Sequence, residues 1–218
     1  KAGFDAAPEC DYLILITANP ATPSPIEGIK TLGQLMHNQP PTFATHKPRA
    51  DDTAVMFYTS GTTGQPKGAE LSHINLLMNA LVVRDLAASA MEPGADAQNV
   101  VLITLPLFHA TAQQGQMNAN LLAGATLSLI PRFEPGAVLE VMKRDKINLW
   151  TGVPTMFHAL LDYAAANDTD TAPIAANLRL TSSGGAAMPM ELMRRFEDTF
   201  GVRILEGYGL SEASPVVA

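Results

Sequence analysis

The chain has 218 residues, of which 47% are hydrophobic and 16% charged, and its net charge at pH 7 is −7. This composition is typical of a globular chain with a substantial core and excludes a disordered one. The acidic balance argues against general binding to nucleic acid or to an anionic membrane surface. A local cationic loop could still bind phosphate, because salt screens distant charges beyond roughly 10 Å.

The sequence also indicates the cellular compartment of the protein. Cys10 is the only cysteine, so an internal disulfide is excluded and a reducing, cytoplasmic compartment is expected. No apolar run approaches the roughly 20 residues that cross a bilayer, and no secretion signal opens the sequence. The chain begins with Lys1 in place of methionine, which suggests an internal piece of a longer protein.

Residues 1–50 are predicted to be the end of a preceding unit followed by a connection. The apolar run at 12–17 favours a short buried strand. Two proline-rich stretches, 19–28 and 38–48, lie on either side of a short polar segment. We therefore expect a boundary at residue 50, with the main folded unit over residues 51–218.

From residue 51 onward, short apolar strands alternate with amphipathic helices. Ser72 is the predicted N-cap of a helix, and Pro154 suits the first turn of another. The first helix is expected to bury the face formed by Ile74, Leu77, Met78, Leu81 and Val82. The predicted strands cover 53–59, 100–105, 126–130, 147–151, 178–182 and 202–206, and the later helices cover 112–123, 135–146, 154–166 and 189–200. This alternation predicts an α/β fold with a largely parallel sheet and helices on both faces.

Four loops that follow predicted strands carry unusual residues. They cover residues 60–68, 106–109, 183–187 and 207–212. Ligands in folds of this class bind beyond the carboxyl ends of the strands, so we expect these loops to form one site at one edge of the sheet.

The first loop, within "YTSGTTGQPKG" (58–68), is predicted to bind a polyphosphate. It does not fit the G-x-x-x-x-G-K-[ST] pattern, because Pro66 precedes Lys67 and Gly68 follows it, and it lacks the G-x-G-x-x-G pattern. Its glycines would let backbone amides approach a phosphate, and its hydroxyls and lysine would add contacts. The alternative is an ordinary turn. The residues concerned are Thr59, Ser60, Gly61, Thr62, Thr63, Gly64 and Lys67.

The other loops supply complementary groups. Glu212 would be repelled by a phosphate unless a cation such as Mg²⁺ lay between them, and Tyr208 offers a flat face to a base. The small residues of 182–188 would let a purine approach the backbone. Each feature also has a structural interpretation: a solvated glutamate for Glu212, close helix–strand packing for the small residues, and a non-catalytic role for His109.

Together, the segments "YTSGTTGQPKG" (58–68), "LPLFH" (105–109), "SGGAA" (183–187) and "YGLSE" (208–212) resemble the adenylate-forming enzymes. This superfamily contains acyl- and aryl-CoA synthetases, luciferases and the adenylation domains of peptide synthetases. The stretch "YTSGTTGQPKGAELSH" (58–73) is most similar to the corresponding stretch of bacterial long-chain fatty acid–CoA ligases. The resemblance implies part of a large N-terminal α/β domain that uses ATP, Mg²⁺ and coenzyme A to convert a fatty acid first to an acyl adenylate and then to a thioester.

The resemblance also implies roles for residues at matching positions. Lys67, His109 and Glu212 would be catalytic, with Glu212 and Thr59 at the metal. The phosphates would lie on residues 59–64 and Lys67, and the acid would lie beside His109. The adenine and nucleotide contacts would be Gly185, Ala186, Gly207, Tyr208, Gly209 and Ser211, the last standing where the family more often has Thr. The acyl pocket would include Trp150, Thr151, Gly152 and Val153.

The chain departs from the family at its end. The ribose-binding Asp, the hinge and the small C-terminal lid domain with its catalytic lysine would all lie beyond Ala218, so we expect weak or no activity from this chain alone. Alternatives within the same chemistry are an aryl-CoA ligase, a luciferase-like enzyme and an acyl-AMP ligase. A non-catalytic nucleotide-binding module comes from another class, and a Rossmann dehydrogenase is disfavoured. A homo-oligomer formed through exposed strand edges is a further possibility.

Overall fold

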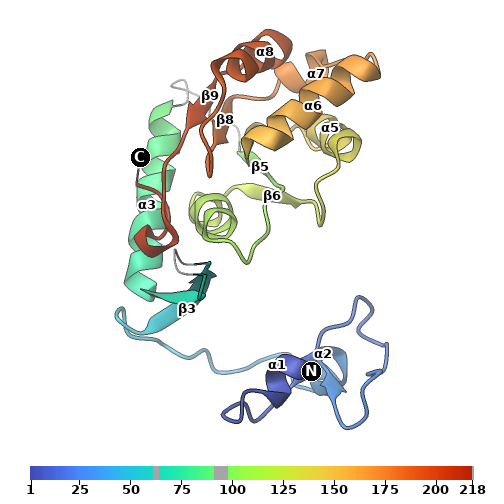
Figure 1. Ribbon diagram of the computed structural model, residues 1–218, viewed down its shortest axis with the longest axis vertical. Helices are drawn as coiled ribbons and strands as arrows, with labels where there is room; N and C mark the ends of the chain where they lie inside the picture. Colours follow the sequence, from blue (N-terminus) through green and yellow to red (C-terminus); the bar gives the residue numbers. More distant parts are fainter. Residues whose placement is uncertain (61–63, 91–97, 218) are drawn as a thin grey trace. The chain divides into compact units, whose positions relative to one another are not determined.

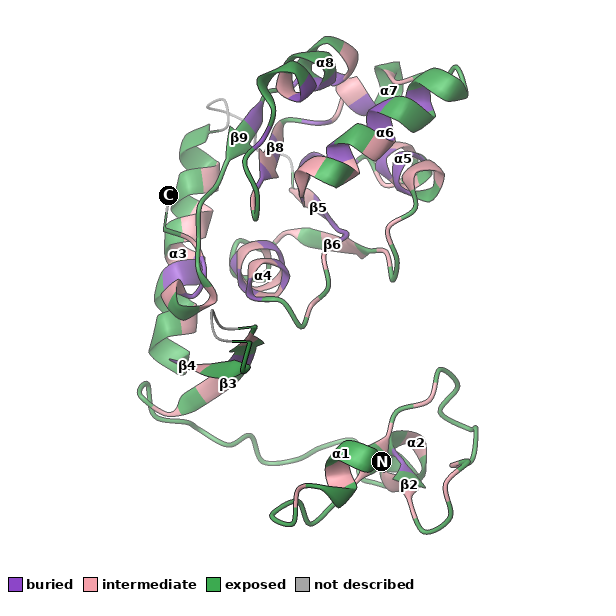
Figure 2. Ribbon diagram, viewed as in Figure 1, coloured by how far each residue is buried: buried purple, intermediate pink, exposed green. Residues whose placement is uncertain are grey.

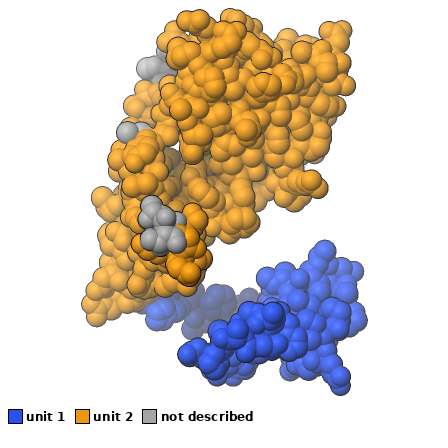
Figure 3. Space-filling view, viewed as in Figure 1, with its two compact units in different colours: residues 1–47 blue, residues 48–218 orange. Residues whose placement is uncertain are grey.

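The computed structural model describes residues 1–60, 64–90 and 98–217, and divides the chain into two compact units. Unit 1 covers Lys1–Lys47 and unit 2 covers Pro48–Ala218 (Figure 3). The division lies close to residue 50, where the proline-rich stretch had suggested a boundary. No helix in the described part of the chain is both long enough and apolar enough to span a membrane.

Unit 1 is held together by local hydrogen bonds. It contains α1 (Ala2–Asp5), the parallel pair β1 (Ile14–Leu15) and β2 (Lys30–Thr31), and α2 (Leu32–Met36). At the start of α2, Thr31 Oγ1 accepts from the backbone of Gln34 at 3.1 Å, and the Gln34 side chain accepts from the backbone of Thr31 at 2.8 Å. This capping box satisfies two free amides. Thr31 is the only buried residue of the unit, so unit 1 lacks an apolar core of its own.

Unit 2 contains a five-stranded sheet in which all neighbours are parallel, as predicted. The strand order is β6-β5-β7-β8-β9. The strands are β5 (Val100–Ile103), β6 (Thr126–Leu129), β7 (Leu149–Gly152), β8 (Leu180–Ser183) and β9 (Ile204–Glu206). Because β5, β7, β8 and β9 run in the same direction, their carboxyl ends form one edge of the sheet.

Helices cover both faces of this sheet (Figure 1). One layer contains α5 (Pro135–Arg144), α6 (Pro154–Ala166), α7 (Ala172–Ala175) and α8 (Met190–Phe200). The other contains α3 (His73–Ala90), the π-helical segment η1 (Thr111–Asn118) and α4 (Ala119–Leu122). Strand β7 lies between the layers: the Trp150 ring packs with Phe157 and Phe196 of the first layer, and Leu149, Trp150 and Thr151 all line a small cavity beneath the second.

An aromatic cluster fills the core of the first layer. Trp150, Phe157, Phe196 and Phe200 are all at most 1% exposed. Phe196 lies at the middle of the cluster, with its ring centroid 4.9 Å from that of Phe157 and 4.6 Å from that of Phe200. The cluster joins β7, α6 and α8, so it fixes the helices that follow two of the parallel strands.

The structure corrects the prediction around the first loop. Residues predicted to be loop and helix start form β4 (Lys67–Ser72), which pairs antiparallel with β3 (Thr53–Thr59) in a separate two-stranded sheet. Phe57 and Leu71 are buried against Ala110 in a second, small core. The sequence hides β4 because only two alternate apolar residues mark it.

The structure confirms helix α3 but not its predicted buried face. Ser72 Oγ accepts from the Asn75 amide at 3.4 Å, as expected of an N-cap. In contrast, Ile74, Leu77, Met78 and Val82 are 40–53% exposed, and the buried residues are Asn79 and Ala80 (Figure 2). Apolar residues lie on most sides of α3, so periodicity could not choose between its faces.

A charged network at the end of α5 gives the first testable prediction. The Asp145 carboxylate accepts from Arg144 Nε at 2.6 Å and from Ser128 Oγ at 2.7 Å. These hydrogen bonds, that from Arg144 above all, lower the pKa of Asp145 to about 2. The native pKa is depressed, so the carboxylate stabilises the fold above its unfolded pKa near 3.9, and this contribution is lost as the pH falls toward 2.

We expect Asp145→Asn to lower the free energy of unfolding by about 1 kcal/mol at pH 7 and by clearly less at pH 3. Urea unfolding of both proteins at the two pH values measures this difference. Asp162→Asn is the matched control. Asp162 pairs with His158 at 2.8 Å and with Arg195 at 3.3 Å, but it is 54% exposed, and exposed pairs of this kind contribute little to stability. A deficit for Asp145→Asn that is equal at both pH values would contradict the prediction.

Candidate active site

Three of the four predicted loops meet at the carboxyl edge of the parallel sheet. They follow β5, β8 and β9, and two hydrogen bonds continue the sheet beyond its strands. The Gly207 amide donates to the Ser183 carbonyl at 2.8 Å, and the Gly184 amide donates to the Gly152 carbonyl at 3.3 Å. A Cβ at Gly184 would lie only 3.2 Å from the Gly207 carbonyl oxygen. A small residue is therefore needed here for close approach of the two loops.

The segment after β9 folds into a tight hairpin. The Leu210 amide donates to the Pro215 carbonyl, and the Val217 amide donates to the Tyr208 carbonyl, both at 2.9 Å. The tip contains the 3-10 turn η2 (Ser211–Ala213), on which Glu212 is exposed. Tyr208 is 62% exposed at the start of the hairpin. The hairpin thus presents a carboxylate and an aromatic face to the outside.

The first loop comes from the separate hairpin β3–β4, not from the parallel sheet. Thr59 and Lys67 are opposite each other at the end of this hairpin, and η2 lies against β4. The strand that begins with Lys67 is therefore next to the turn that carries Glu212. Gly64 has a φ of +79°, a conformation that glycine adopts without strain. Of the other predicted phosphate contacts, Ser60 is exposed and 61–63 lie outside the described residues.

His109 is exposed at the start of η1, and its hydrogen bonding defines its tautomer. Its Nδ1 accepts from the Thr111 amide at 3.2 Å. In the neutral ring the proton then lies on Nε2. The exposed side of the ring therefore presents an N–H donor, which suits a carboxylate or phosphate oxygen.

The predicted acyl residues on and after β7 separate into two groups. Trp150 is 1% exposed, and its Nε1 donates to Thr104 Oγ1 at 3.1 Å. Gly152 lies beneath it, with Trp150 Cζ2 only 2.8 Å from the position of a Cβ. The structure thus places both in the core. Thr151 is only partly buried and lines, with Trp150, a cavity of about 90 Å³, and Val153 lies beside Gly185.

Comparison with known proteins assigns the chain to a family. The sequence matches the AMP-binding enzyme family over residues 6–218. The chain belongs to the AMP-binding enzymes. This confirms the resemblance to adenylate-forming enzymes that the four motifs had suggested.

Relatives in this family are acid–CoA ligases of more than one kind. The long-chain-fatty-acid–CoA ligase of Bacillus subtilis is 38% identical over 165 residues, which cover 76% of this chain and 28% of that protein. The feruloyl-CoA synthase of Amycolatopsis sp is also 38% identical, over 77% of this chain and 32% of that enzyme. The chain therefore spans about a third of the length of these relatives.

Solved structures of the family share the fold. ATP-bound MatB from Rhodopseudomonas palustris has a TM-score of 0.68 and 33% identity, covering 80% of this chain and 32% of MatB. A malonyl-CoA ligase with methylmalonyl-CoA and AMP bound has a TM-score of 0.66 and 30% identity, over 78% of this chain and 35% of that protein.

The structure of this AMP-binding enzyme also reveals buried amides that the sequence interpretation missed. Gln114 Nε2 donates to the Leu76 carbonyl of α3, and Gln116 Nε2 donates to the Thr151 carbonyl of β7, both at 2.8 Å. Both glutamines are at most 2% exposed. They fix η1, and with it His109, between α3 and the sheet. The sequence did contain a signal for these contacts, because asparagine and glutamine are unusually frequent in the predicted helix 112–123.

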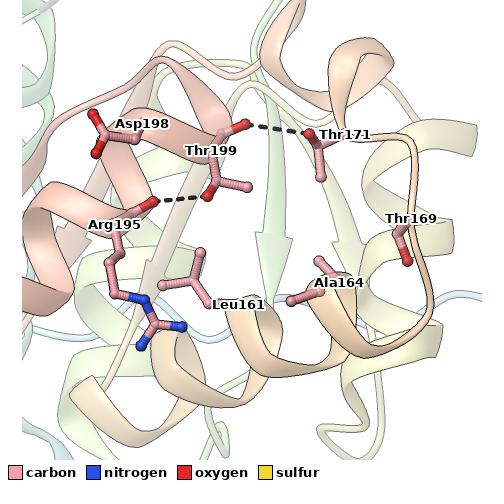
Figure 4. Close-up of a pocket in the computed structure, with 8 residues that line it drawn as sticks. Leu161, Ala164, Thr169, Thr171, Arg195, Asp198 and Thr199 are labelled. Atoms are coloured by element: carbon pink, nitrogen blue, oxygen red, sulfur yellow. Dashed lines mark hydrogen bonds between the residues drawn. The ribbon is translucent and has the colours of Figure 1, made fainter.

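A larger pocket lies away from these residues. It has a volume of about 420 Å³ and lies between the carboxyl-terminal halves of α6 and α8 (Figure 4). Leu161 and Ala164 line it on the α6 side, and Thr171 and Thr199 are joined across it by a 3.2 Å hydrogen bond. No predicted site residue lines it, and these helix ends lead to the amino edge of the sheet. It is therefore separate from the candidate site.

Proposed function

We propose that the protein containing this chain is an AMP-forming acid–thiol ligase that activates a fatty acid with ATP and transfers it to coenzyme A. The main support is the arrangement of the Glu212 turn against the strand that begins with Lys67, beside the carboxyl edge of the parallel sheet. The turn of Glu212 lies against the strand that contains Lys67, and on this basis we assign phosphate binding to the lysine and metal binding to the carboxylate. The assignment of ATP as the nucleotide is supported by MatB, a relative of the same fold whose structure has ATP bound.

The residues present fit a magnesium ion that is shared with ATP. The described residues contain no group of three or more His, Cys, Asp or Glu side chains that could hold a metal alone. Mg²⁺ commonly takes one or two protein oxygens and completes its shell with phosphate oxygens and water. Glu212 and Thr59 would hold it in this way. When bound, it would neutralise charge on the phosphates.

The chemistry needs alignment more than proton transfer. A carboxylic acid is already ionised at neutral pH, so its oxygen can attack the α-phosphorus of ATP without a general base, and pyrophosphate leaves. The chain would orient the reactants and stabilise the developing charge. We assign the phosphates to Thr59, Ser60, residues 61–64 and Lys67. His109 would donate from Nε2 to an oxygen of the acid.

The remaining assignments concern the nucleotide and the acid. Tyr208 would stack on the base, because it is exposed next to the small-residue loop after β8. We keep Thr151 and Val153 as acid contacts, whereas Trp150 and Gly152 support them from the core. The adenylate is further enclosed by Gly185, Ala186, Gly207, Gly209 and Ser211.

A second candidate is an aryl-CoA ligase. Its support is that the feruloyl-CoA synthase matches this chain with the same 38% identity as the fatty acid ligase. The exposed face of the site and the reaction steps are the same for both candidates. The identity of the acid separates them.

Acid-dependent ATP–pyrophosphate exchange tests the proposal. Exchange by the protein that contains this chain is compared with exchange by its Lys67→Ala and Glu212→Ala variants, using C8 to C18 fatty acids and hydroxycinnamic acids. Binding of MgATP to the native chain and to the same two variants is followed by calorimetry. We expect both variants to lose at least tenfold in exchange, because Lys67→Ala removes a positive charge that would neutralise the phosphates and Glu212→Ala removes a proposed ligand of the Mg²⁺ that would do the same. Lys143→Ala and Glu140→Ala, which change residues in the carboxyl-terminal half of α5, the end that leads to the amino edge of the sheet, are the matched controls.

The outcomes separate the candidates. Exchange fastest with fatty acids supports the first, and exchange fastest with hydroxycinnamic acids supports the second. MgATP binding that needs Lys67 but gives no exchange with any acid would indicate a nucleotide-binding role for the chain. Exchange unchanged in both variants, or no binding of MgATP by the native chain, would contradict the assigned site.

A further inference from the structure

The hairpin that carries Glu212 is closed by few contacts of its own. Gly209 pairs antiparallel with Val216, and the amides of Leu210 and Val217 make the two hydrogen bonds that close it. Ser214 is buried, but Glu212 and Val217 are exposed. Such a short hairpin is only marginally stable by itself, so its position must depend on what it is attached to.

A side chain from the distant helix α3 makes that attachment. Asn79 Nδ2 donates to the Val216 carbonyl at 3.1 Å, across a sequence separation of 137 residues. Asn79 is 8% exposed and lies next to the buried Ala80. The red C-terminal segment accordingly runs beside α3 in Figure 1. The bond joins the return arm of the hairpin to the middle of the helix.

Burial of the Asn79 amide destabilises the fold unless the amide holds the hairpin. Among the described residues, Asn79 Oδ1 has no hydrogen-bond partner. A half-satisfied buried amide is unfavourable compared with an apolar side chain of similar size. The bond to Val216 is the one interaction of the Asn79 side chain that an apolar residue could not make. The need to hold the hairpin therefore explains why an amide stands at this point of α3.

Helix α3 is also attached to the other parts of the site. It follows β4, the strand that begins with Lys67, and its Leu76 carbonyl accepts from Gln114 of η1, the segment that His109 precedes. Asn79 adds the hairpin of Glu212 to the same helix. All three groups assigned to catalysis are thus positioned relative to one rigid element.

We propose that Asn79 is a positioning residue that fixes the Glu212 hairpin on α3 and thereby sets Glu212 relative to Lys67. The effect passes from Asn79 to Val216, across the antiparallel pair to Gly209, and along the chain to Glu212. Its importance for catalysis depends on the proposed function, because Glu212 must act on ATP. The attachment itself does not depend on it.

Amide hydrogen exchange followed by NMR tests the attachment directly. In Asn79→Ala, we expect the amides of Leu210 and Val217 to exchange about threefold to tenfold faster, the range for one lost hydrogen bond. The amides of β7 and β8 should keep their native rates. Asn79→Gln, which retains an amide donor, should recover part of the protection and serves if the alanine variant does not fold.

Asn148→Ala is the matched control for a buried asparagine. Asn148 is 6% exposed, and its Oδ1 accepts from the Val100 amide at 2.9 Å, within the parallel sheet. This variant should speed exchange at Val100 and leave Leu210 and Val217 unchanged. Native exchange rates at Leu210 and Val217 in Asn79→Ala would overturn the proposal. Equal acceleration throughout the sheet would also overturn it, because Asn79 would then be a general stabilising residue.

A second readout measures the consequence for the site. In ATP–pyrophosphate exchange, Asn79→Ala should raise the Mg²⁺ concentration for half-maximal rate by about threefold to tenfold and leave the KM for the acid unchanged. A raised KM for the acid with an unchanged Mg²⁺ requirement would overturn the link to Glu212. If the hairpin amides respond as expected but the protein that contains this chain shows no exchange reaction with any acid, the attachment stands and the proposed function fails.

Discussion

Replacement of Phe196 by alanine is expected to lower the free energy of unfolding by about 3–5 kcal/mol, the range for a fully buried phenylalanine. Phe196 is 0% exposed, and its ring contacts the rings of Phe157 and Phe200. Removing it leaves a cavity at the point where α6, α8 and β7 meet. These elements are rigidly connected to the sheet, so they can close that cavity only in part.

The sequence provides its own probe for this measurement. Trp150 is the only tryptophan, and its ring centroid lies 6.3 Å from that of Phe196. Urea unfolding followed by its fluorescence therefore reports on the cluster. Phe108→Ala, at a position 84% exposed in the same unit, should change stability by less than about 0.5 kcal/mol.

A milder substitution keeps the prediction testable if Phe196→Ala does not fold. Phe196→Leu retains most of the apolar volume and should cost about 1–2 kcal/mol. A loss below about 1.5 kcal/mol for Phe196→Ala would show that the surroundings collapse onto the cavity, and the cluster would then not be the rigid centre of the first layer.

The parallel sheet could be predicted because its signals are local. Val100–Ile103 and Leu149–Gly152 are short apolar runs between helical segments, and such runs are buried on both faces in a parallel sheet. Strand β4 was not predicted, because it forms by pairing with β3 and its own sequence contains little more than Leu71 to indicate a strand. The buried side of α3 escaped for a related reason, since its apolar residues fit more than one face.

In the candidate site, too, features with a local sequence signal could be predicted and features set by tertiary contacts could not. Glycines, hydroxyls and charged residues at strand ends are visible in the sequence, and three of the four loops do meet at one edge of the sheet. The role of Trp150 was not visible, because a tryptophan beside a predicted pocket can line it or support it from below. The contact of Asn79 with Val216 joins residues that are 137 positions apart in the sequence, and no local pattern could indicate it.

Replacement of Gly209 by alanine in the protein that contains this chain is expected to reduce ATP–pyrophosphate exchange by about a hundredfold, close to 3 kcal/mol in transition-state stabilisation. A Cβ at this position would overlap the Pro215 carbonyl oxygen and lie 3.0 Å from its carbonyl carbon. Both are backbone atoms held in the hairpin by the bond from the Leu210 amide. The hairpin can accept the methyl group only by opening.

Opening the hairpin would displace several proposed nucleotide contacts at once. Tyr208 precedes Gly209, and Ser211 and Glu212 follow at the tip, so a single methyl group moves the aromatic face, the hydroxyl and the carboxylate together. For this reason we expect a larger effect than from removing one charge. The amides of Leu210 and Val217 should lose protection against hydrogen exchange, because their carbonyl partners move away.

The parallel sheet should not be affected, which makes the test specific. Gly209 lies after the last strand, so the free energy of unfolding reported by Trp150 should stay within about 1 kcal/mol of the native value. Gly3→Ala is a control of the same residue type, since a Cβ there meets no atom within 4 Å. Native exchange activity in Gly209→Ala would mean that the hairpin does not position the nucleotide. A loss of several kcal/mol in stability would mean that the hairpin supports the core as well, and activity lost in this variant could then not be assigned to Glu212 and its neighbours.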